Sequence, residues 1–520
     1  MREIFTVDCE TDPFLFGRVP TPFIWGAYNG EDYWEFNDAK ELVEFLENRN
    51  CIAYAHNGGK FDWHFVLDYI PAFSDVLIIN GRLSKFKIGG CEFRDSYNIL
   101  PLPLSAYKKD AFDYTKLEKN VRHNHMNEIR EYLKNDCVYL FEIVTRFIAD
   151  YGFNLTLAGA ALKKWQFIAD KNAPQTDAEY YNALSHYYYG GRVQCFKTGI
   201  IEEDFKVVDI NSAYPYAMMK KHPYGQIYRV ADQLPQKGVE QCFIELTCIS
   251  AGAFPHRTKN GGLNFPNDDQ VRTYFITGWE YLTALKVGAI DNITIIAVIE
   301  FFETIDFCDY VDQFYEMKKQ AKRNNDKAGY INSKLLLNSL YGKFGSNPQN
   351  YKSSQLVPPR YIDAAEQDGF RWCGEIGNWY LAEKDLEPDE MKFYDIAVSA
   401  SITGFVRAYM FESMQKCKGL IYCDTDSIAA HDISGLKLDP EILGFWDIEA
   451  DCDYGAVAGK KLYAFHDKNG NWKKASKGVR LDHNQIVQIA KGASVTHQNE
   501  APTFSMKKNP HFIERTIVIK

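Results

Sequence analysis

The sequence predicts a multidomain protein that begins with an α/β domain. The chain has 520 residues, and single hydrophobic cores stop growing at roughly 250–300 residues, so two or more domains are expected. Up to about residue 150, short apolar strands alternate with helical segments, which is typical of an α/β fold. Hydrophobic residues make up 46% of the chain, which indicates globular folding rather than disorder.

The elements expected along the chain follow from hydrophobic periodicity and turn signals. They are, in order, strands at residues 4–7 and 51–55 with a helix at 40–47 between them, a long helix at 127–148, a strand at 205–210 that leads into a helix, a mixed insertion at 221–303, two helical runs within 307–343 that break near 324–329, an irregular segment at 348–394, and a pair of strands around Asp424. The chain ends in a basic segment.

The charge distribution is uneven. The formal net charge is -10, which by itself argues against a polyanionic partner, because phosphate binding needs Lys and Arg. Residues 460–520, however, contain 12 Lys and Arg against 4 Asp and Glu. A basic C-terminal module beside acidic domains suits a protein that binds a polyanion at one place and metals at another. A solvated basic tail would have the same composition.

The cysteines and the apolar runs favour an intracellular protein that does not span a membrane. None of the 12 cysteines forms a C-x-x-C pair or a zinc-like spacing, as expected of reduced core residues. Residues 1–10 are acidic and strand-like, unlike a signal peptide. The longest apolar run, residues 293–302, is broken by Glu300 and is too short to cross a bilayer.

A first set of carboxylates lies in the N-terminal part. Asp8 and Glu10 occupy positions i and i+2 of an expected strand and therefore point to the same face. Asp62 follows in a Gly-containing loop, and Tyr132 and Asp136 share one face of the long helix. Like charges that converge are costly unless they bind a cation. Four carboxylates and a tyrosine can hold two divalent ions for hydrolytic chemistry.

A second set of carboxylates lies in the central part. Asp209 ends an expected strand, and Asp424 and Asp426 lie in a tight acidic turn between two strands. Hard oxygen ligands with open positions suit Mg²⁺ bound together with a triphosphate. An ordinary Asx turn is the alternative interpretation of the Asp-Thr-Asp-Ser segment taken alone.

A helical face between these carboxylates carries polar groups of three kinds. Lys334, Asn338 and Tyr341 fall at i, i+4 and i+7 of one helix. A cation, an amide and a planar ring in a row suit the phosphate, sugar and base of a nucleotide. Lys318, in the preceding helix, can supply a second phosphate contact.

The first carboxylate set resembles the three exonuclease motifs of the proofreading superfamily, with a tyrosine in the third motif. The resemblance implies that Asp8, Glu10, Asp62 and Asp136 are catalytic metal ligands and that Tyr132 positions the attacking water. It further implies contacts with a single-stranded 3′ end from His56, Asn57, Phe61, Ser96 and Lys109. Tyr97 follows Ser96 where that family commonly has leucine.

The second set resembles the catalytic motifs of family B DNA polymerases. Motifs A, B and C are matched by Asp209-x-x-Ser212-x-Tyr214-Pro215, Lys334-x-x-x-Asn338-Ser339-x-Tyr341-Gly342 and Tyr422-x-Asp424-Thr425-Asp426-Ser427. The resemblance implies that Asp209, Asp426 and the Ile210 carbonyl bind metal, with Asp424 as a further ligand or a primer-end contact. It also implies a nucleotide site made of Tyr214, Lys318, Lys334, Asn338 and Tyr341. Ala213 stands where motif A usually has leucine.

Three shorter segments resemble the small protein-primed phage enzymes of this family. Tyr188-Tyr189-Gly190-Gly191 is similar to their linker between the exonuclease and polymerase halves, Thr403-Gly404-Phe405-Val406-Arg407 to their primer-contacting segment, and Lys461-Leu462-Tyr463 to their K-x-Y motif at the primer terminus. The implied DNA contacts are Tyr189, Gly190, Gly191, Thr403, Arg407, Lys461 and Tyr463. Val406 departs from the small residue that is common at its position.

The implied fold is an α/β exonuclease domain of the ribonuclease H-like type, followed by an α+β right-hand polymerase with palm, fingers, thumb and two insertions. The expected boundaries are residues 1–150 for the exonuclease domain, 151–220 and 395–459 for the palm, 221–303 for a first insertion of the terminal-protein region 1 type, 304–347 for the fingers, 348–394 for a second insertion of the terminal-protein region 2 type, and 460–520 for a basic thumb region.

The implied activity is DNA-directed DNA synthesis with 3′→5′ proofreading, on a linear viral genome whose replication starts from a protein primer. Two Mg²⁺ ions are expected at each site, with Mn²⁺ as an alternative. The expected partners are primer–template DNA, dNTPs and a terminal protein. The enzyme would be a monomer or a heterodimer with that protein, in the host cytoplasm and without a membrane.

Two rival classes of function remain to be weighed. A nuclease with a vestigial polymerase half is disfavoured because Asp209, Asp424, Asp426, Lys334 and Tyr341 are intact. A non-catalytic DNA-binding or scaffold protein would be expected to have lost carboxylates, whereas both sets are complete.

Overall fold

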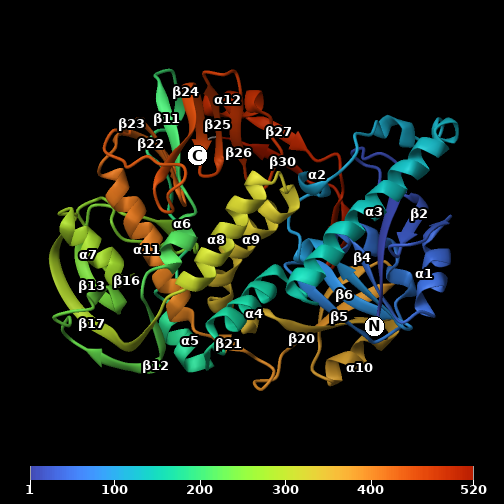
Figure 1. The fold of residues 1–520 in the computed structure, drawn as a ribbon, viewed down its shortest axis with the longest axis horizontal. Helices are drawn as coiled ribbons and strands as arrows, with labels where there is room; N and C mark the ends of the chain where they lie inside the picture. The colour runs from blue at the N-terminus through green and yellow to red at the C-terminus, as the bar shows by residue number, and fades with distance from the viewer. Residues whose placement is uncertain (1, 519–520) are drawn as a thin grey trace.

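The computed structural model describes residues 2–518. The N-terminal α/β domain forms one side of the molecule, and the helix pair α8 (Cys308–Arg323) and α9 (Lys327–Phe344) lies near the centre, between this domain and the segment at residues 222–305 (Figure 1). None of the helices within residues 2–518 is long and apolar enough to cross a membrane.

The N-terminal domain is built on a sheet whose central strands are parallel. β4 lies between β1 and β7 and runs parallel to both, while the outer strands are antiparallel. The domain contains β1 (Glu3–Thr11), β2 (Pro22–Tyr28), β3 (Tyr33–Phe36), α1 (Ala39–Glu47), β4 (Cys51–Ala55), β5 (Ser74–Ile79), β6 (Arg82–Ile88), β7 (Cys91–Asp95), α2 (Leu104–Tyr107) and α3 (Met126–Tyr151). The expected strands and the long helix are therefore present, and α3 packs across β1 and β2.

The second insertion extends this same sheet. Its elements are β18 (Lys352–Val357), α10 (Ile362–Gln367), β19 (Arg371–Ile376), β20 (Trp379–Asp385) and β21 (Phe393–Tyr394). β18 pairs with β5, so the ten strands run β19-β20-β18-β5-β6-β7-β4-β1-β2-β3. The expectation of an irregular segment at 348–394 is wrong. Its strands are short and polar on one face; β20 pairs with β18 and β19 within the insertion, and only β18 pairs with a strand almost 280 residues earlier in the chain.

A central eight-stranded sheet carries the second set of carboxylates. Its order is β26-β25-β24-β11-β23-β22-β9, with β10 paired to β24. The strands are β9 (Val193–Cys195), β10 (Gly199–Ile201), β11 (Phe205–Ile210), β22 (Lys418–Asp424), β23 (Ser427–Asp432), β24 (Trp446–Gly459), β25 (Leu462–Asp467) and β26 (Trp472–Ser476). Because β25 and β26 belong to this sheet, it continues beyond the boundary expected at residue 459.

The first insertion forms a small domain of its own. It consists of β12 (His222–Ala231), β13 (Cys242–Ser250), β14 (His256–Arg257), β15 (Leu263–Asn264), β16 (Val271–Thr277), α7 (Gly278–Lys286) and β17 (Ile290–Ile305). Four of its strands form an antiparallel sheet in the order β12-β17-β13-β16. Helix α7 packs against α11 (Ile396–Met414), which is buried along most of its length beneath the central sheet.

The other helices connect these parts. They are α4 (Leu157–Ala169), which packs on α9, α5 (Ala178–Ser185), which follows the two-residue strand β8 (Gln175–Thr176), and α6 (Ala213–Met218), which follows β11. The helix pair matches the two expected runs, and α8 and α9 are separated by the turn at residues 324–326.

The C-terminal module spans the gap between the two sides of the molecule. It contains α12 (His483–Ala490), β27 (Val495–Gln498), β28 (Thr503–Ser505), β29 (Lys508–His511) and β30 (Glu514–Ile517). Met506 is buried in the core of the N-terminal domain, and the ring of Phe504 lies 5.4 Å from that of Phe61. The module also contacts the second insertion, where Asn509 accepts a hydrogen bond from the backbone of Gly377.

Candidate active sites

The carboxylates of the second set converge at the ends of neighbouring strands. Asp209 is the penultimate residue of β11 and lies opposite Ser427 of β23, while Asp424 ends β22. Thr425 has a positive φ of 60°, and the amide of Asp426 donates to the carbonyl of Asp424 at 2.7 Å. The tight acidic turn expected from the sequence is therefore present, and it faces Asp209.

A cavity of about 600 Å³ opens above these residues. Its acidic side is lined by Asp209, Asp426, Asp447 and Glu449, and the backbone of Ile210 also borders it. The opposite side is basic and comes from the helix pair. The size and the opposed charges suit a nucleoside triphosphate bound between cations and carboxylates.

The two carboxylates that face the cavity are arranged to share a cation. Burial and the neighbouring Asp426 raise the pKa of Asp209 well above its usual range. Burial, with Asp424 and Glu449, likewise raises the pKa of Asp426. Carboxylates that repel each other in a half-buried site with open space beside them fit a divalent ion.

Asp424 is paired differently from the other two. Lys461 places its Nζ 2.6 Å from Oδ1 and 2.8 Å from Oδ2 of Asp424. The backbone amide of Lys461 also donates to the hydroxyl of Tyr422, which fixes the lysine beside the turn. Asp424 therefore differs from Asp209 and Asp426 in having a lysine that balances its charge at short range.

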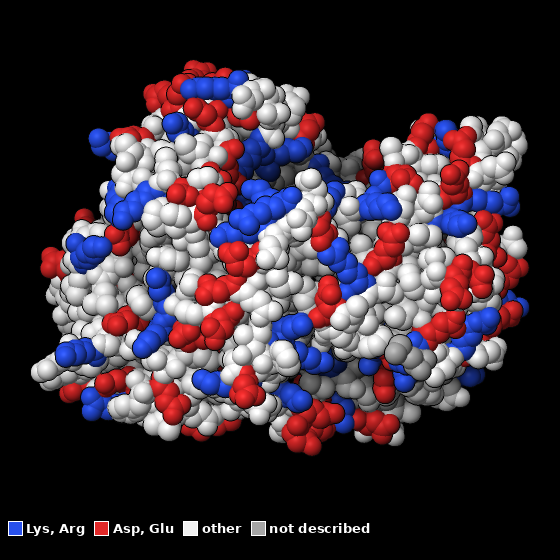
Figure 2. All heavy atoms as spheres, in the orientation of Figure 1, with Lys and Arg blue, Asp and Glu red and all other residues white. Residues whose placement is uncertain are grey.

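The basic side of the cavity comes from α8 and α9. Figure 2 shows Lys and Arg gathered over this helix pair, beside a hollow beneath the C-terminal module. Burial and the neighbouring Lys334 lower the pKa of Lys318 to about 8, and its Nζ lies 3.2 Å from Ser212 Oγ. Sequence reasoning missed Lys319, Lys322 and Arg323, which line the same wall. Because these residues lie one, four and five positions after Lys318 on one helix, their sequence spacing could have predicted that they lie on one side of that helix.

Tyr214 and Tyr341 form a stacked pair beside the cavity. Their ring centroids are 4.3 Å apart with an interplanar angle of 7°. Asn338 lines the cavity one turn before Tyr341, with its amide donating to the carbonyl of Lys334. The expected face of cation, amide and ring therefore points toward the carboxylates of the central sheet.

The carboxylates of the first set also converge. Oxygens of Asp8, Glu10 and Asp136 lie within 4.8 Å of one another. The Oδ1 atom of Asp136 is buried and has no hydrogen-bond partner among the described residues. Asp62 lies nearby but outside this group, and its Oδ1 accepts from Cys9 Sγ at 3.3 Å. A converging set of oxygens with an orphaned buried atom fits a divalent cation.

The charges at this site support the same conclusion. Burial and the surrounding carboxylates raise the pKa values of Asp8 and Glu10 well above their usual range. Lys109 is the cation at the site, with its Nζ 3.0 Å from Asp136 Oδ2. Although burial opposes it, the carboxylates of Asp136 and Asp8 raise the pKa of Lys109. The lysine thus faces the carboxylates, whereas the sequence led us to expect a contact with DNA.

Tyr132 is held by two aromatic residues that sequence reasoning missed. Its hydroxyl lies 3.0 Å from that of Tyr114, and the ring of Phe112 stacks on it with centroids 4.4 Å apart. The segment that supplies both residues follows Lys109 directly, which was the only signal for them in the sequence. Tyr114 is half-exposed and can therefore orient Tyr132 from the solvent side.

Two of the residues predicted to contact a single strand are bonded to groups within the protein. Ser96 is completely buried, and its hydroxyl donates to the Ala55 carbonyl. The ring nitrogens of His56 lie within hydrogen-bond distance of Ser96 Oγ and the Leu102 carbonyl, and burial lowers the pKa of His56 to about 4. Both side chains thus help to shape the loop that precedes Asp62, and their contact with single-stranded DNA stays a prediction.

Three predicted primer contacts are also buried. Arg407 is 2% exposed, and its guanidinium is bonded inside the protein to Glu280 and to the carbonyls of Tyr189 and Gly190. Thr403 donates to a carbonyl of its own helix, and the Tyr189 side chain is likewise buried. Contacts of these residues with DNA therefore stay a prediction, because in this structure their side chains are turned into the protein.

The remaining residues predicted to contact DNA differ in their exposure and in the groups they touch. Asn57 adopts a left-handed conformation and accepts from Arg82, while Phe61 packs edge-on against Phe14 and Phe504. Gly190 is exposed and Gly191 is half-buried beside the acidic turn. Tyr463 is 8% exposed and its ring stacks on Phe465.

Comparison with known proteins identifies the group to which this arrangement is related. The family model for DNA polymerase type B, organellar and viral, matches residues 103–362. A DNA-directed DNA polymerase from Enterobacteria phage PRD1 is 36% identical, with 99% of this chain and 98% of that protein covered. A DNA polymerase from Bacillus phage Nf is 27% identical over 89% of this chain and 86% of its own length.

The fold is similar to that of a solved polymerase complex. The structure of phi29 DNA polymerase with primer–template DNA and incoming nucleotides matches with a TM-score of 0.76 and 20% identity, and each chain is covered completely. This match confirms the fold class predicted from the sequence, an α/β exonuclease-type domain followed by a right-hand polymerase architecture.

Proposed function

Since the chain belongs to the type B DNA polymerases of organelles and viruses and is a DNA-directed DNA polymerase of the phage type, we propose that its two acidic sites divide nucleotide addition and 3′→5′ proofreading between them. The observation that carries the proposal is the pair of separate carboxylate clusters, each in its own sheet. The cluster in the central sheet faces a cavity of nucleotide size, and the cluster in the N-terminal domain holds three converging carboxylates.

In the polymerase site, Asp209, Asp426 and the Ile210 carbonyl would hold two Mg²⁺ ions. Lys318 and Lys334 face these carboxylates across the cavity and would bind the triphosphate of a dNTP. Lys461 and Asp424 orient the primer end, whose 3′ hydroxyl attacks the α-phosphate in line while pyrophosphate leaves. Tyr214 packs beneath the sugar.

In the exonuclease site, Asp8, Glu10, Asp62 and Asp136 would hold the metal ions. Tyr132, steadied by Tyr114, orients the water that attacks the terminal phosphodiester. At both sites, bound divalent ions would stabilise the attacking and leaving oxygens of the displacement. The two residues Phe14 and Phe61 form an aromatic edge beside this site, on which a single-stranded end can stack.

We further infer that replication starts from a terminal protein, and that the insertions serve this mode of replication. The second insertion joins the N-terminal sheet through β18 and meets the C-terminal module at Asn509, so these parts together bridge the two sides of the molecule. Such a bridge suits a polymerase that stays bound to its template during processive synthesis. A decorative surface loop is not supported, because Leu356, Ile376 and Leu381 are buried in the core of the N-terminal domain.

The domain roles follow from this proposal. The N-terminal domain is the exonuclease, the central sheet with α6 and α11 is the palm, and the pair α8 and α9 is the fingers. The C-terminal module is the thumb, and β25 and β26 are counted with the palm. The proposed setting is a virus-encoded enzyme acting in the host cytoplasm on primer–template DNA.

The test is a primer-extension and degradation assay with purified protein and two variants. Asp426→Ala should abolish nucleotide addition and leave degradation of a single-stranded oligonucleotide intact. Asp8→Ala combined with Glu10→Ala should do the reverse. Loss of both activities from either folded variant would contradict the division into two sites.

A further inference from the structure

A buried ion pair links the first insertion to the loop beside the polymerase carboxylates. We propose that Glu280 is a positioning residue for nucleotide addition, which acts through Arg407 and the loop at residues 189–192 on the turn that carries Asp424 and Asp426. The inference rests on the proposed role of those two carboxylates. It assigns to the first insertion a part in the geometry of the polymerase site.

The ion pair itself is sealed from solvent. The side chains of Glu280 and Arg407 are each 1% exposed, and Nε of Arg407 lies 2.7 Å from Oε1 of Glu280. The other carboxylate oxygen accepts from the amide and the hydroxyl of Thr277, at 3.0 and 2.9 Å, in a capping box at the start of α7. Glu280 therefore has one fixed position, and it imposes that position on the guanidinium.

The close approach of the two helices depends on a glycine. A Cβ atom at Gly404 of α11 would lie 2.4 Å from Oγ1 of Thr277. Any larger residue would push the start of α7 away from α11. The insertion is thus fitted to α11 at the point where its carboxylate reaches Arg407.

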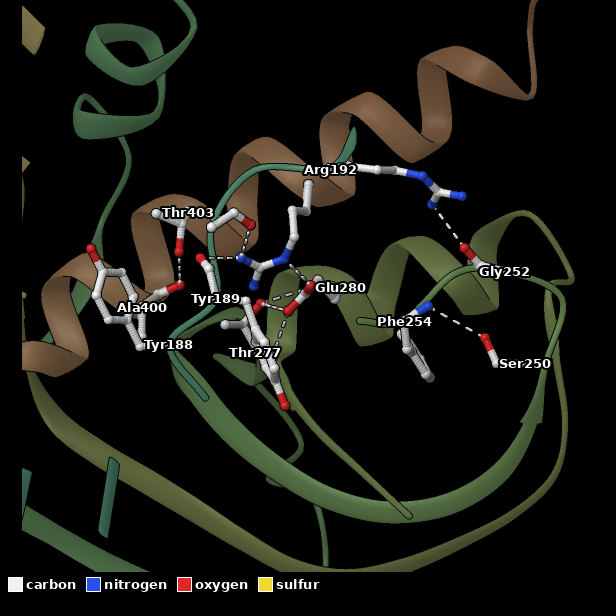
Figure 3. A network of polar contacts seen from close by, with 12 residues as sticks. Tyr188, Tyr189, Arg192, Ser250, Gly252, Phe254, Thr277, Glu280, Ala400 and Thr403 are labelled. Atoms are coloured by element: carbon white, nitrogen blue, oxygen red, sulfur yellow. Dashed lines mark hydrogen bonds and ion pairs between the residues drawn. The ribbon is translucent and has the colours of Figure 1, made fainter. Parts of the chain in front are cut away.

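Arg407, held by Glu280, also bonds the backbone of the loop at residues 189–192. Its Nη1 donates to the carbonyls of Tyr189 and Gly190, at 2.7 and 3.2 Å (Figure 3 shows the loop and the network around it). A guanidinium presents several donors in a rigid fork, so holding one edge on a carboxylate fixes where the others point. Through Arg407, the position of the loop therefore depends on the insertion.

The loop in turn contacts the catalytic turn directly. The amide of Thr425 donates to the carbonyl of Arg192 at 2.7 Å, and a Cβ at Gly191 would lie 2.7 Å from Cγ2 of Thr425. Thr425 is β-branched and has a φ of 60°, a conformation that persists only where the surroundings hold it. Asp424 and Asp426 flank this residue, so a shift of the loop would move both carboxylates.

A second anchor runs parallel to the first. Arg192 is buried, none of the carboxylates within residues 2–518 pairs with it, and its Nη1 donates to the carbonyl of Gly252 at 2.8 Å (Figure 3). Its guanidinium also lies 4.2 Å from the ring centroid of Phe265. Gly252 and Phe265 both belong to the first insertion. Arg407 of α11 and Arg192 of the loop therefore both bond to the first insertion, and both help to hold the loop beside the turn.

The experiment removes the ion pair between Glu280 and Arg407 without leaving an unpaired buried charge. Removing one partner of a buried pair strands the other, whereas replacing both by apolar residues does not, so the main variant is Glu280→Leu combined with Arg407→Leu. The matched control is Glu300→Gln, which breaks the surface pair of Glu300 with Arg229 in the same insertion. Single-nucleotide addition, degradation of a single-stranded oligonucleotide and thermal unfolding are measured for each protein.

We expect kcat for nucleotide addition to fall by about 100-fold in the double variant, since misplacement of reacting groups by an ångström has an effect of that size. The dNTP KM should change little, because the triphosphate-binding lysines lie on α8 and α9. Exonuclease activity should stay within about twofold of the unmodified enzyme, as should both activities of the control. Arg407→Lys, which keeps the charge but loses the fork, should lower kcat in the same direction.

Three outcomes would overturn the inference. They are unchanged kcat in the double variant, an equal fall of both activities together with early unfolding, and a rise in dNTP KM without a fall in kcat. The inference and the proposed function fail separately. Should Asp426→Ala still extend primers, the assignment of the polymerase site is wrong, whatever the double variant does.

Discussion

Lys461 and Asp424 form an ion pair whose Nζ–Oδ1 distance is 2.6 Å, at the edge of the turn that also carries Asp426. The lysine immediately precedes β25 and the aspartate ends β22, so the pair links two strands that are not adjacent in the central sheet. It leaves Asp209 and Asp426 as the two carboxylates whose mutual repulsion is not relieved by a lysine at such short range.

This pairing predicts unequal effects of removing the acids. Asp426→Asn should lower primer extension by at least about 1,000-fold, because it removes a carboxylate that would hold the divalent ions beside the reacting phosphate. Asp424→Asn should lower it less, since its charge is already neutralised. Lys461→Met should weaken primer binding, seen as a higher KM for primer–template DNA. Lys460→Met is the control, because the Lys460 ammonium bonds a carbonyl of the first insertion and not the turn. Equal losses in the two aspartate variants would contradict the distinction.

The stacked tyrosines predict sugar selectivity. With Tyr341 packed flat against it, Tyr214 cannot swing away from an incoming 2′ hydroxyl. Tyr214→Val should therefore raise ribonucleotide incorporation relative to deoxyribonucleotide incorporation by about 10- to 100-fold, the range that one steric contact can supply. Tyr214→Phe keeps the ring and should leave the ratio unchanged. The ratio is measured by competing nucleotides on one template, and an unaltered ratio in the valine variant removes Tyr214 from this role.

The hydroxyl pair in the N-terminal site predicts a smaller, selective effect. Tyr114→Phe removes the partner of the Tyr132 hydroxyl and keeps the aromatic packing. Exonuclease activity should fall by about 2- to 10-fold, the value of one hydrogen bond, while primer extension is unchanged. Tyr139→Phe is the control, because Tyr139 bonds Asp110 on the outer face of the same helix. A rate for Tyr114→Phe equal to that of the control would show that Tyr132 needs no such partner.

The turn of the helix pair is tied to the N-terminal domain. Arg146 of α3 donates to both carboxylate oxygens of Asp326, the residue that also caps α9. Arg146→Met releases the turn and keeps the cap. We expect the dNTP KM to rise by about 2- to 5-fold at low salt, the value of an exposed pair, and the difference to disappear at high salt.

The control for this prediction comes from the same helix. Arg130→Met breaks a surface pair with Glu35 that does not reach the helix pair, and it should leave the dNTP KM unchanged. A KM difference for Arg146→Met that persists at high salt would mean that the side chain acts through packing and not through charge.

Most of the local structure could be predicted because its causes are local. The strands at 51–55 and 205–210 coincide with β4 and β11, and the break in the helix pair lies at the turn before Asp326. The second insertion was misjudged because its strands are short and polar on one face and because β18, which joins them to the N-terminal sheet, pairs with the distant strand β5.

The sequence by itself determined which chemistry the protein can perform. Two groups of carboxylates, a lysine-bearing helical face and a tyrosine after the motif A aspartate are side chains of fixed type at fixed short spacing, so they are visible without a structure. Only the tertiary structure decided how these groups are divided and held. Only the structure shows that Lys461 pairs with Asp424 and that Arg407 is buried against Glu280, because both pairs join residues that are distant in the chain. Which distant segments meet depends on strand pairing and on burial against a shared core, and neither is encoded in a local motif.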